Sequence, residues 1–245
     1  MTLIAIVSAL HEELSAIDAL LEGRSLQQRG GRSFHRGRLQ GHEVLLVLSG
    51  IGKVAAASTA TLALDAFGAQ ALLFTGVAGG LAPGVRVGDV VVARELLQHD
   101  LDVSPLFPRY VVPSAGRARF AADAVLADAL AAAADEVLAQ PHPALQRLGI
   151  GTVRSHQGLV VSGDRFVGTA VESDALRTAL PDALAVEMEG AAVAQVCAAF
   201  GRPFAVLRTV SDRADDSAHV DFQRFIAEVA AEYSRDTVAA ALRSL

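Results

Sequence analysis

The feature that most constrains the fold of this chain is an alternation between short apolar runs and longer Ala- and Leu-rich stretches with helical spacing. The short runs are rich in Val, Ile and Leu, as buried strands are, and they cover residues 3–9, 44–49, 71–76, 87–93, 158–162, 183–186 and 204–210. Helices are predicted over residues 53–67, 121–138, 188–200 and 221–242. This alternation predicts an α/β fold, a three-layer α/β/α sandwich around a mixed, mostly parallel central sheet.

The length of the chain, 245 residues, fits one domain, which we place over residues 1–245. Although 52% of the residues are hydrophobic, no run approaches the ~18 uninterrupted apolar residues that a bilayer helix needs, so no membrane span is predicted. The apolar run at residues 3–10 has no basic stretch before it and leads directly into His11, which favours a buried strand over a secretion signal.

Cysteine content and net charge indicate where the protein is located and which partners it is expected to lack. Cys197 is the only cysteine, so it has no internal disulfide partner, and its apolar helical surroundings favour a buried side chain over a nucleophile. The cytoplasm is therefore the expected location. A formal net charge of -6 argues against a phosphate-backbone footprint, so nucleic acid is not an expected partner.

A glycine-rich segment at residues 75–81 follows one predicted strand, at the edge of the sheet where ligands bind in such folds. Its glycines permit close approach of the backbone to a ligand, and a tight turn is the alternative interpretation. The spacing departs from the dinucleotide fingerprint G-x-G-x-x-G, and no Walker lysine follows. No nucleotide cofactor is therefore predicted.

Carboxylates follow three of the predicted strands. Glu12 and Glu13 come after the first strand, Glu187 and Glu189 after the sixth, and Asp212 after the last. Each alone also fits a residue that complements a helix dipole or caps a turn. The histidines are scattered and form no Cys/His cluster, so no metal is expected. Carboxylates around one pocket suit a reaction with a cationic transition state, such as glycosidic cleavage.

The order of motifs along the chain carries a resemblance to a known family. The motifs read A-L-H-E-E-L at residues 9–14, S-G-I-G-K-V-A-A at 49–56, T-G-V-A-G-G-L at 75–81, V-G-D-V-V at 87–91, V-S-G-D-R-F at 161–166, V-E-M-E at 186–189 and R-T-V-S-D at 208–212. Together they resemble the 5'-methylthioadenosine/S-adenosylhomocysteine nucleosidases of the nucleoside phosphorylase superfamily, over nearly the whole chain. The resemblance implies a cofactor-free hydrolysis of these two nucleosides, and also of 5'-deoxyadenosine, to adenine and a 5-substituted ribose in methionine and adenine salvage.

The resemblance also implies roles for the three carboxylates. Asp212 would protonate or hydrogen-bond N7 of adenine and so ease departure of the base. Glu189 would bind the ribosyl hydroxyls and face the developing oxocarbenium ion, while Glu13 would position and deprotonate the attacking water.

Substrate contacts follow from the same motifs. Met188 would lie under the sugar, Phe166 would stack on the base, and the backbone of Val167 would read the edge of adenine. Ala78 of the glycine-rich segment and Glu187 of the V-E-M-E motif are further candidates for substrate binding.

Other positions extend the implied site outward. Ser211 and Arg208 resemble residues that orient Asp212 and Glu13, with a surface arginine as the alternative for Arg208. The remaining candidates are Phe222, which would cover the 5'-thio substituent or pack in the core, and Val103 and Pro113 of a Pro-rich loop, which would complete the pocket of a neighbouring subunit in a homodimer.

Water is favoured over phosphate as the nucleophile. The stretch that carries a phosphate-binding arginine in related phosphorylases carries acidic residues here, and a carboxylate beside a phosphate dianion is repelled by ~1 kcal/mol even in water. Val77 departs from the family pattern, because many relatives have Ser or Thr there. A futalosine-type nucleoside hydrolase, a purine nucleoside phosphorylase and a non-catalytic nucleoside-binding protein stay open as alternatives.

Overall fold

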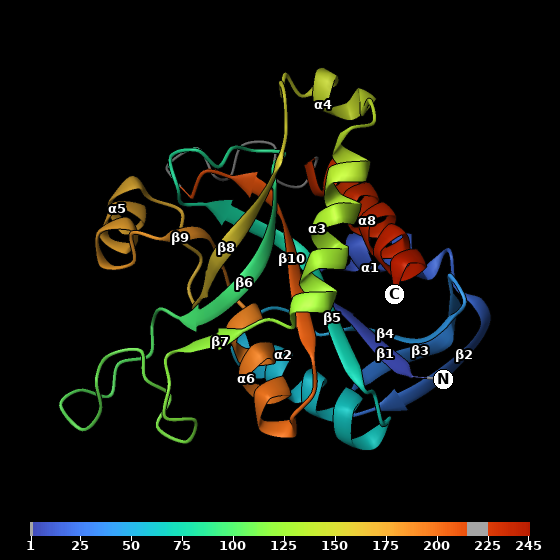
Figure 1. Cartoon of the computed structure of the whole chain (residues 1–245), viewed down its shortest axis with the longest axis horizontal. Coiled ribbons are helices and arrows are strands. Elements are labelled where there is room, and N and C mark those ends of the chain that lie inside the picture. The colour runs from blue at the N-terminus through green and yellow to red at the C-terminus, as the bar shows by residue number, and fades with distance from the viewer. Residues whose placement is uncertain (1, 215–224) are drawn as a thin grey trace.

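A ten-stranded mixed sheet forms the centre of residues 2–214 and 225–245, which the computed structural model describes (Figure 1). Its strands are β1 (Leu3–Ser8), β2 (Glu22–Arg29), β3 (Arg32–Leu39), β4 (His42–Leu48), β5 (Ala71–Gly80), β6 (Val90–Gln98), β7 (Arg119–Ala121), β8 (Ser155–Ser162), β9 (Ala183–Glu187) and β10 (Phe204–Asp212). The order is β10-β6-β8-β9-β5-β1-β4-β3-β2, with β7 on β6 and a further pairing of β10 with β5. Strands β5, β10, β6, β8 and β9 therefore close into a ring, from which β1, β4, β3 and β2 extend.

Helices cover both faces of this sheet. They are α1 (His11–Asp18), α2 (Lys53–Thr61) with the π-helical turn η1 (Leu62–Ala66), α3 (Ala124–Leu138), α4 (Pro143–Arg147), α5 (Ala170–Ala179), α6 (Gly190–Phe200), the turn η2 (Ile226–Ala230) and α8 (Ala231–Ser244). Helices α1, α3 and α8 pack on one face, and α2 and α6 pack on the other. The predicted α/β/α sandwich around a mixed sheet is thus confirmed, with five parallel and five antiparallel strand pairings.

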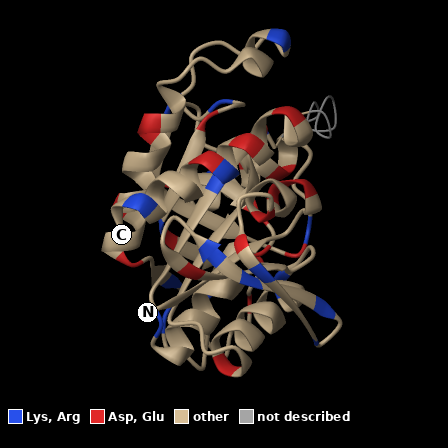
Figure 2. Cartoon of the chain, turned by 90° about the vertical axis from the view of Figure 1, so that its right-hand side faces the viewer, with Lys and Arg blue, Asp and Glu red and all other residues tan. Residues whose placement is uncertain are grey.

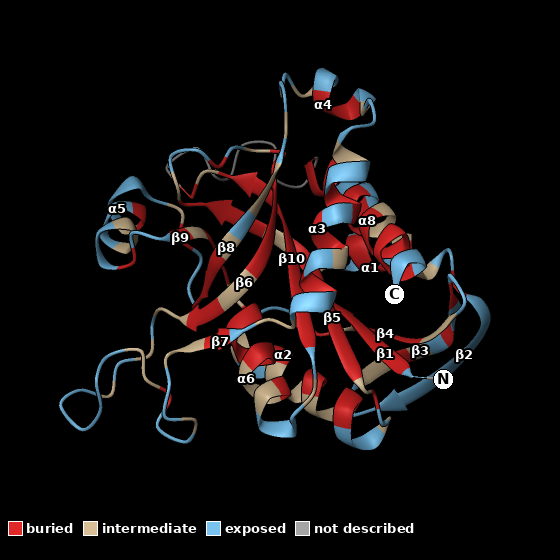
Figure 3. Cartoon of the chain, in the orientation of Figure 1, coloured by how far each residue is buried: buried red, intermediate tan, exposed pale blue. Residues whose placement is uncertain are grey.

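Strand β1 shows why the central strands read as continuous apolar runs. Its residues alternate between two cores, with Ile4 and Ile6 facing α1, α3 and α8, and with Ala5 and Val7 facing α2 and α6. A strand that is buried on both faces has no polar side, as the red central strands of Figure 3 show.

The glycine-rich segment differs from its prediction, because β5 continues through it to Gly80 instead of ending at residue 76. A Cβ at Gly76 would lie 2.5 Å from Nη1 of Arg208, and one at Gly79 would lie 2.9 Å from Oδ1 of Asp212. The absent side chains therefore make room for two polar side chains of the neighbouring strand β10 while the backbone keeps its strand pairing.

Several elements have no counterpart in the predicted pattern, among them the β2–β3 hairpin and helix α5. The β2–β3 hairpin was missed because every residue of β2 is exposed and leaves no alternation to read, although the Gly30–Gly31 turn, with φ of 56° and 72°, is a hairpin signal. Helix α5 was missed although Thr169 and Glu172 form a capping box at its start. On the side of the molecule that carries the hairpin, basic and acidic residues are interspersed (Figure 2).

Three further features bear on the predictions. Cys197 lies fully buried in α6, and burial raises the pKa of its thiol to about 12. The first residues of the predicted last helix, 221–224, lie outside the described residues, whose final helix is α8. Within the described parts of the chain, none of the helices combines the length and the apolar character needed to span a bilayer.

Candidate active site

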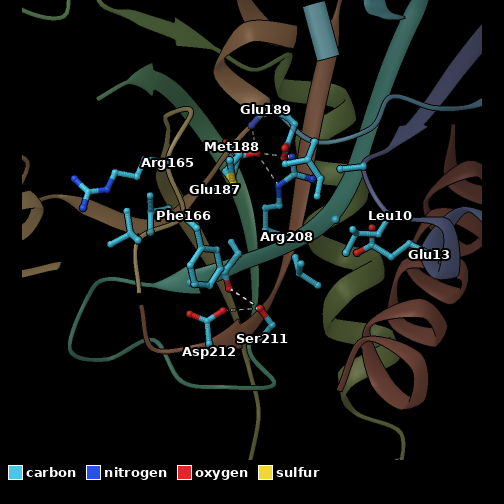
Figure 4. Close-up of a pocket in the computed structure, with 18 residues that line it drawn as sticks. Leu10, Glu13, Arg165, Phe166, Glu187, Met188, Glu189, Arg208, Ser211 and Asp212 are labelled. Carbon is cyan, nitrogen blue, oxygen red and sulfur yellow. Dashed lines mark hydrogen bonds and ion pairs between the residues drawn. The ribbon is translucent and has the colours of Figure 1, made fainter. Parts of the chain in front are cut away.

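One cavity collects most of the predicted site residues at the carboxyl ends of β5, β9 and β10 (Figure 4). Those that line it are Glu13, Ala78, Phe166, Val167, Glu187, Met188, Glu189, Arg208, Ser211 and Asp212. Figure 4 places Glu13 on one side, Met188 and Glu189 on another, and Asp212 beside Ser211 on a third. The three predicted catalytic carboxylates therefore share one cavity.

Two predicted residues lie elsewhere, and the position of a third is not described. Phe222 falls outside the described residues. Val103, half-buried, and Pro113, exposed, lie in the long connection between β6 and β7 and do not line this cavity. Their expected contribution to a neighbouring subunit stays a prediction.

Glu13 is held by the first turn of α1 and is completely buried. Its Oε2 accepts a hydrogen bond of 2.6 Å from the hydroxyl of Ser8, and its Oε1 is buried without a hydrogen-bond partner among the described residues. Burial raises the pKa of this carboxyl above its usual value, against the opposing effects of the Ser8 hydrogen bond and the charge of Arg208. An acceptor oxygen is thus left for a group that enters the cavity.

The prediction that Arg208 orients Glu13 is wrong. Ser8 holds Glu13, whereas both Nη2 and Nε of Arg208 donate to Oε2 of Glu187, at 2.6 and 3.2 Å. The guanidinium also lies 4.1 Å from the centre of the Phe74 ring, and the ion pair is almost completely buried. The two partners sit on β10 and β9, which are not neighbours in the sheet, so the pair bridges the ring of strands.

Glu187 is saturated by protein donors. Its two oxygens accept from Arg208, from the hydroxyl of Ser162, and from the backbone N–H groups of Glu189 and Gly190 at 2.8 to 3.0 Å. A carboxylate at a helix N-terminus is stabilised by the helix dipole, and here it caps α6 from the preceding strand. Glu187 therefore complements the helix N-terminus, as one interpretation of the sequence allowed, but from the end of β9 and not from the first turn of α6.

Glu189 stands at the N-cap of α6, where its Oε1 accepts a 2.8 Å hydrogen bond from the backbone N–H of Gly52. Burial, together with the neighbouring charge of Glu187, raises its pKa to about 7, while Arg208 and the backbone N–H groups of Gly52 and Met188 act in the opposite direction. The carboxyl therefore titrates near neutral pH.

Asp212 ends β10 and is oriented through both carboxylate oxygens. Oδ2 accepts from the hydroxyl of Ser211 at 2.9 Å, and Oδ1 accepts from the backbone N–H of Ala214 at 2.7 Å. The hydrogen bond from Ser211 is the contact that its predicted orienting role requires. The ring of Phe166 lies on the same side of the cavity as Asp212 (Figure 4).

Sequence reasoning missed three residues that shape the site: Ser8, Gly52 and Ser162. Each lies near the end of a predicted strand, so the rule that located the acids also applied to them. Within the described residues, no group of three or more His, Cys, Asp or Glu side chains is arranged to hold a metal ion.

Comparisons with known proteins agree with this geometry. The sequence model of the Phosphorylase superfamily matches residues 3–243. A 5'-methylthioadenosine/S-adenosylhomocysteine nucleosidase from Neisseria meningitidis, solved with methylthio-immucillin-A, is 36% identical over 100% of both chains with a TM-score of 0.87. The corresponding enzyme from Colwellia psychrerythraea 34H, solved with adenine, is 32% identical over 98% of this chain and 94% of that one, with a TM-score of 0.88.

A mutant of futalosine hydrolase from Helicobacter pylori is also similar, at 33% identity over 100% of both chains and a TM-score of 0.85. Identity at this level over full-length chains establishes the family and the reaction class. The chain belongs to the phosphorylase superfamily and, within it, to the 5'-methylthioadenosine/S-adenosylhomocysteine nucleosidases, which are N-glycosyl hydrolases.

Proposed function

We propose that this enzyme hydrolyses 5'-methylthioadenosine and S-adenosylhomocysteine to adenine and the 5-substituted ribose, as a step of methionine and adenine salvage. The observation that carries the proposal is the convergence of Glu13, Glu189 and Asp212, from three separate elements, on one cavity. Relatives that share the fold and a third of the sequence were solved with analogues of these nucleosides.

Asp212 assists departure of the purine base. Its carboxyl, held by Ser211 and by the N–H of Ala214, donates a proton to N7 of the purine as the bond between C1' and N9 breaks. Protonation at N7 lets the base depart neutral with the electron pair of the broken bond.

Glu189 and Glu13 act on the sugar. Glu189 accepts hydrogen bonds from the ribosyl hydroxyls and, when ionised, stabilises the positive charge that develops at C1'. The free Oε1 of Glu13 takes the proton of a water molecule whose oxygen bonds to C1'. The proton gained by Glu13 balances the one given by Asp212.

The cavity supports water over phosphate as the nucleophile. Arg208, a buried cation that lines the cavity, is already paired with Glu187 and so does not offer its charge to an anion. A phosphate dianion would meet the buried carboxylates of Glu13 and Glu189 instead.

The remaining predicted contacts complete the proposal. Phe166 would stack on adenine, the Val167 backbone would read its edge, and Ala78 and Met188 would line the base and sugar positions. In a homodimer, Val103 and Pro113 would close the neighbouring pocket, and exposed Leu106 and Phe107 on the same loop are apolar side chains suited to such a contact. The lone cysteine is compatible with the predicted cytoplasmic location.

The proposal is tested with purified protein and a panel of methylthioadenosine, adenosylhomocysteine, inosine and futalosine, each with and without phosphate. We expect adenine and a free 5-thioribose from the first two nucleosides, with a rate independent of phosphate. Sugar 1-phosphate formed only with phosphate would refute hydrolysis. Exclusive turnover of futalosine would instead identify the activity named for the Helicobacter pylori relative.

The variant Asp212→Asn tests the role of the acid. We expect adenine release to fall by at least about 100-fold while binding of a methylthioadenosine analogue stays measurable, because the amide keeps the shape but does not supply the proton. The exposed control Asp174→Asn should match the wild type. A wild-type protein that binds but never releases adenine would favour a passive binding protein.

A further inference from the structure

Three chain segments are tied together beside the cavity by charged side chains that the proposed reaction does not use. Nζ of Lys53, at the start of α2, lies 2.5 Å from Oδ1 of Asp100, just after β6. Oδ2 of Asp100 accepts from the backbone N–H of Asp164 at 2.9 Å. Oδ1 of Asp164 in turn accepts from the backbone N–H of Lys53 at 2.7 Å. The contacts form a closed triangle, which we call the clamp.

The clamp borders the cavity at two points. On one side, Gly52 precedes Lys53 and donates its N–H to Glu189, while a Cβ at Gly52 would lie only 3.2 Å from Oδ1 of Asp164. Gly52 also has φ of 98°, which other residues rarely adopt, so its N–H direction depends on this backbone conformation. On the other side, Asp164 is followed by Arg165, Phe166 and Val167, which all line the cavity.

The clamp is partly shielded from water. The side chain of Lys53 is 16% exposed and that of Asp100 is 33% exposed, and Lys53 also donates to the side chain of Gln98 at 3.2 Å. Burial acts to raise the pKa of Asp100, but the hydrogen bonds from Lys53 and Asp164 outweigh it and lower the pKa overall. Asp164 in addition caps α2, whose N-cap residue Gly52 has no side chain for this purpose.

We propose that Lys53, Asp100 and Asp164 are positioning residues that hold the Gly52 N–H against Glu189 and the Phe166 segment against the base. The inference rests on the proposed nucleoside hydrolysis and adds residues outside the cavity lining to it. A misplacement of about 1 Å in such a supporting shell lowers turnover by roughly 100-fold.

The clamp should also influence the titration of Glu189. The groups that face this carboxyl are Glu187 from β9, Arg208 from β10, and the backbone N–H groups of Gly52 and Met188. The Gly52 hydrogen bond favours the ionised form. When the clamp is broken this bond weakens, so the pKa of Glu189 rises and more alkaline conditions are needed to ionise it.

The experiment compares Lys53→Met, Asp100→Asn, their double variant and the rescue variant Lys53→Arg. We expect kcat/KM to fall by roughly 10- to 100-fold in each single variant. The acid limb of its pH profile should move upward by about half a pH unit, and the double variant should be little worse than either single one, because all break one unit. Lys53→Arg should recover most of the activity.

Asp128→Asn is the matched control, because it removes an ion pair of the same 2.5 Å length, to Arg94, on α3. It should leave kcat/KM and the pH profile unchanged. Folded variants, checked by thermal unfolding, that keep wild-type kcat/KM and an unmoved acid limb would overturn the inference. An inactive wild type would instead refute the proposed function, and NMR titration of the Glu189 carboxyl in wild type and Asp100→Asn would still decide on the clamp.

Discussion

The two sides of the cavity treat their carboxylates in opposite ways. On the side of β9 and β10, Glu187 receives an ion pair, a hydroxyl and two backbone N–H groups. On the side of β1 and α1, Glu13 receives one hydroxyl and keeps a buried oxygen without a partner among the described residues. An acceptor satisfied by the protein maintains the shape of the site, whereas one left open is available to water or substrate. Equal burial therefore does not mean equal function.

The largest effect on turnover is expected at Glu13, on the side of the cavity where a carboxylate oxygen is left open. In Glu13→Gln the amide accepts the Ser8 hydrogen bond but does not take a proton from water, so we expect kcat to fall by about 10²- to 10⁴-fold. Analogue binding, measured by calorimetry, should change only a few-fold. Glu12→Gln, in the same helical turn but exposed, is the control, and an equal loss in both variants would contradict the comparison.

On the saturated side the main loss should be in stability. Arg208→Met leaves the buried Glu187 carboxylate without its counter-ion, and we expect the free energy of unfolding to fall by about 3–5 kcal/mol in urea titrations. Replacing both partners by Met should recover much of this loss. Arg235→Met, at the more exposed Arg235–Asp236 pair, should change it by about 1 kcal/mol or less. If both arginine variants lost a similar free energy of unfolding, the buried pair would be no more important for stability than the exposed one.

Glu189 is intermediate between the saturated Glu187 and the open Glu13, and the pH dependence of activity and stability should show this. With a pKa of about 7 in the free enzyme, kcat/KM should fall tenfold for each pH unit below that value, because the ionised form stabilises the transition state. Since the folded-state pKa is raised, protonated Glu189 favours folding, and this contribution is complete below about 4.5 and lost as the pH rises through about 7. Unfolding measured against pH should lose this dependence in Glu189→Gln. A flat kcat/KM between pH 5 and 8 would contradict the assignment.

The smallest effect is expected for Ser8→Ala, which removes the one hydroxyl that holds Glu13. Loss of a single hydrogen bond of about 1 kcal/mol predicts a several-fold fall in kcat/KM, and the pKa of Glu13 should rise further because this bond lowers it. Ser15→Ala, at an exposed serine of α1, the helix that carries Glu13, should leave kcat/KM unchanged. If Ser8→Ala were as damaging as Glu13→Gln, the hydroxyl itself would take part in the reaction.

The sequence predicted the central strands and the acids at their ends because both leave local signals. Strand β1 is apolar from Leu3 to Val7 since both of its faces are buried, and Glu13, Glu189 and Asp212 lie at or just beyond strand ends. The β2–β3 hairpin left no such signal, because an exposed strand has no hydrophobic period.

Partnerships inside the site were harder to predict. Arg208 and Glu187 meet only because the ring of strands brings β10 opposite β9, and neither residue type nor spacing specifies that closure. The arginine was therefore assigned to the wrong glutamate. The clamp has the same origin, since Lys53, Asp100 and Asp164 come from three distant segments.

The single cysteine gives this enzyme an internal reporter. Cys197 is buried in α6, the helix whose N-terminus holds Glu189, and its thiol is protonated at neutral pH. A thiol reagent therefore reacts only with molecules in which α6 has separated from the sheet, so the rate of labelling counts those openings. Because no other thiol competes, the stability of this one wall of the cavity is measurable in the unmodified protein, with and without a bound nucleoside.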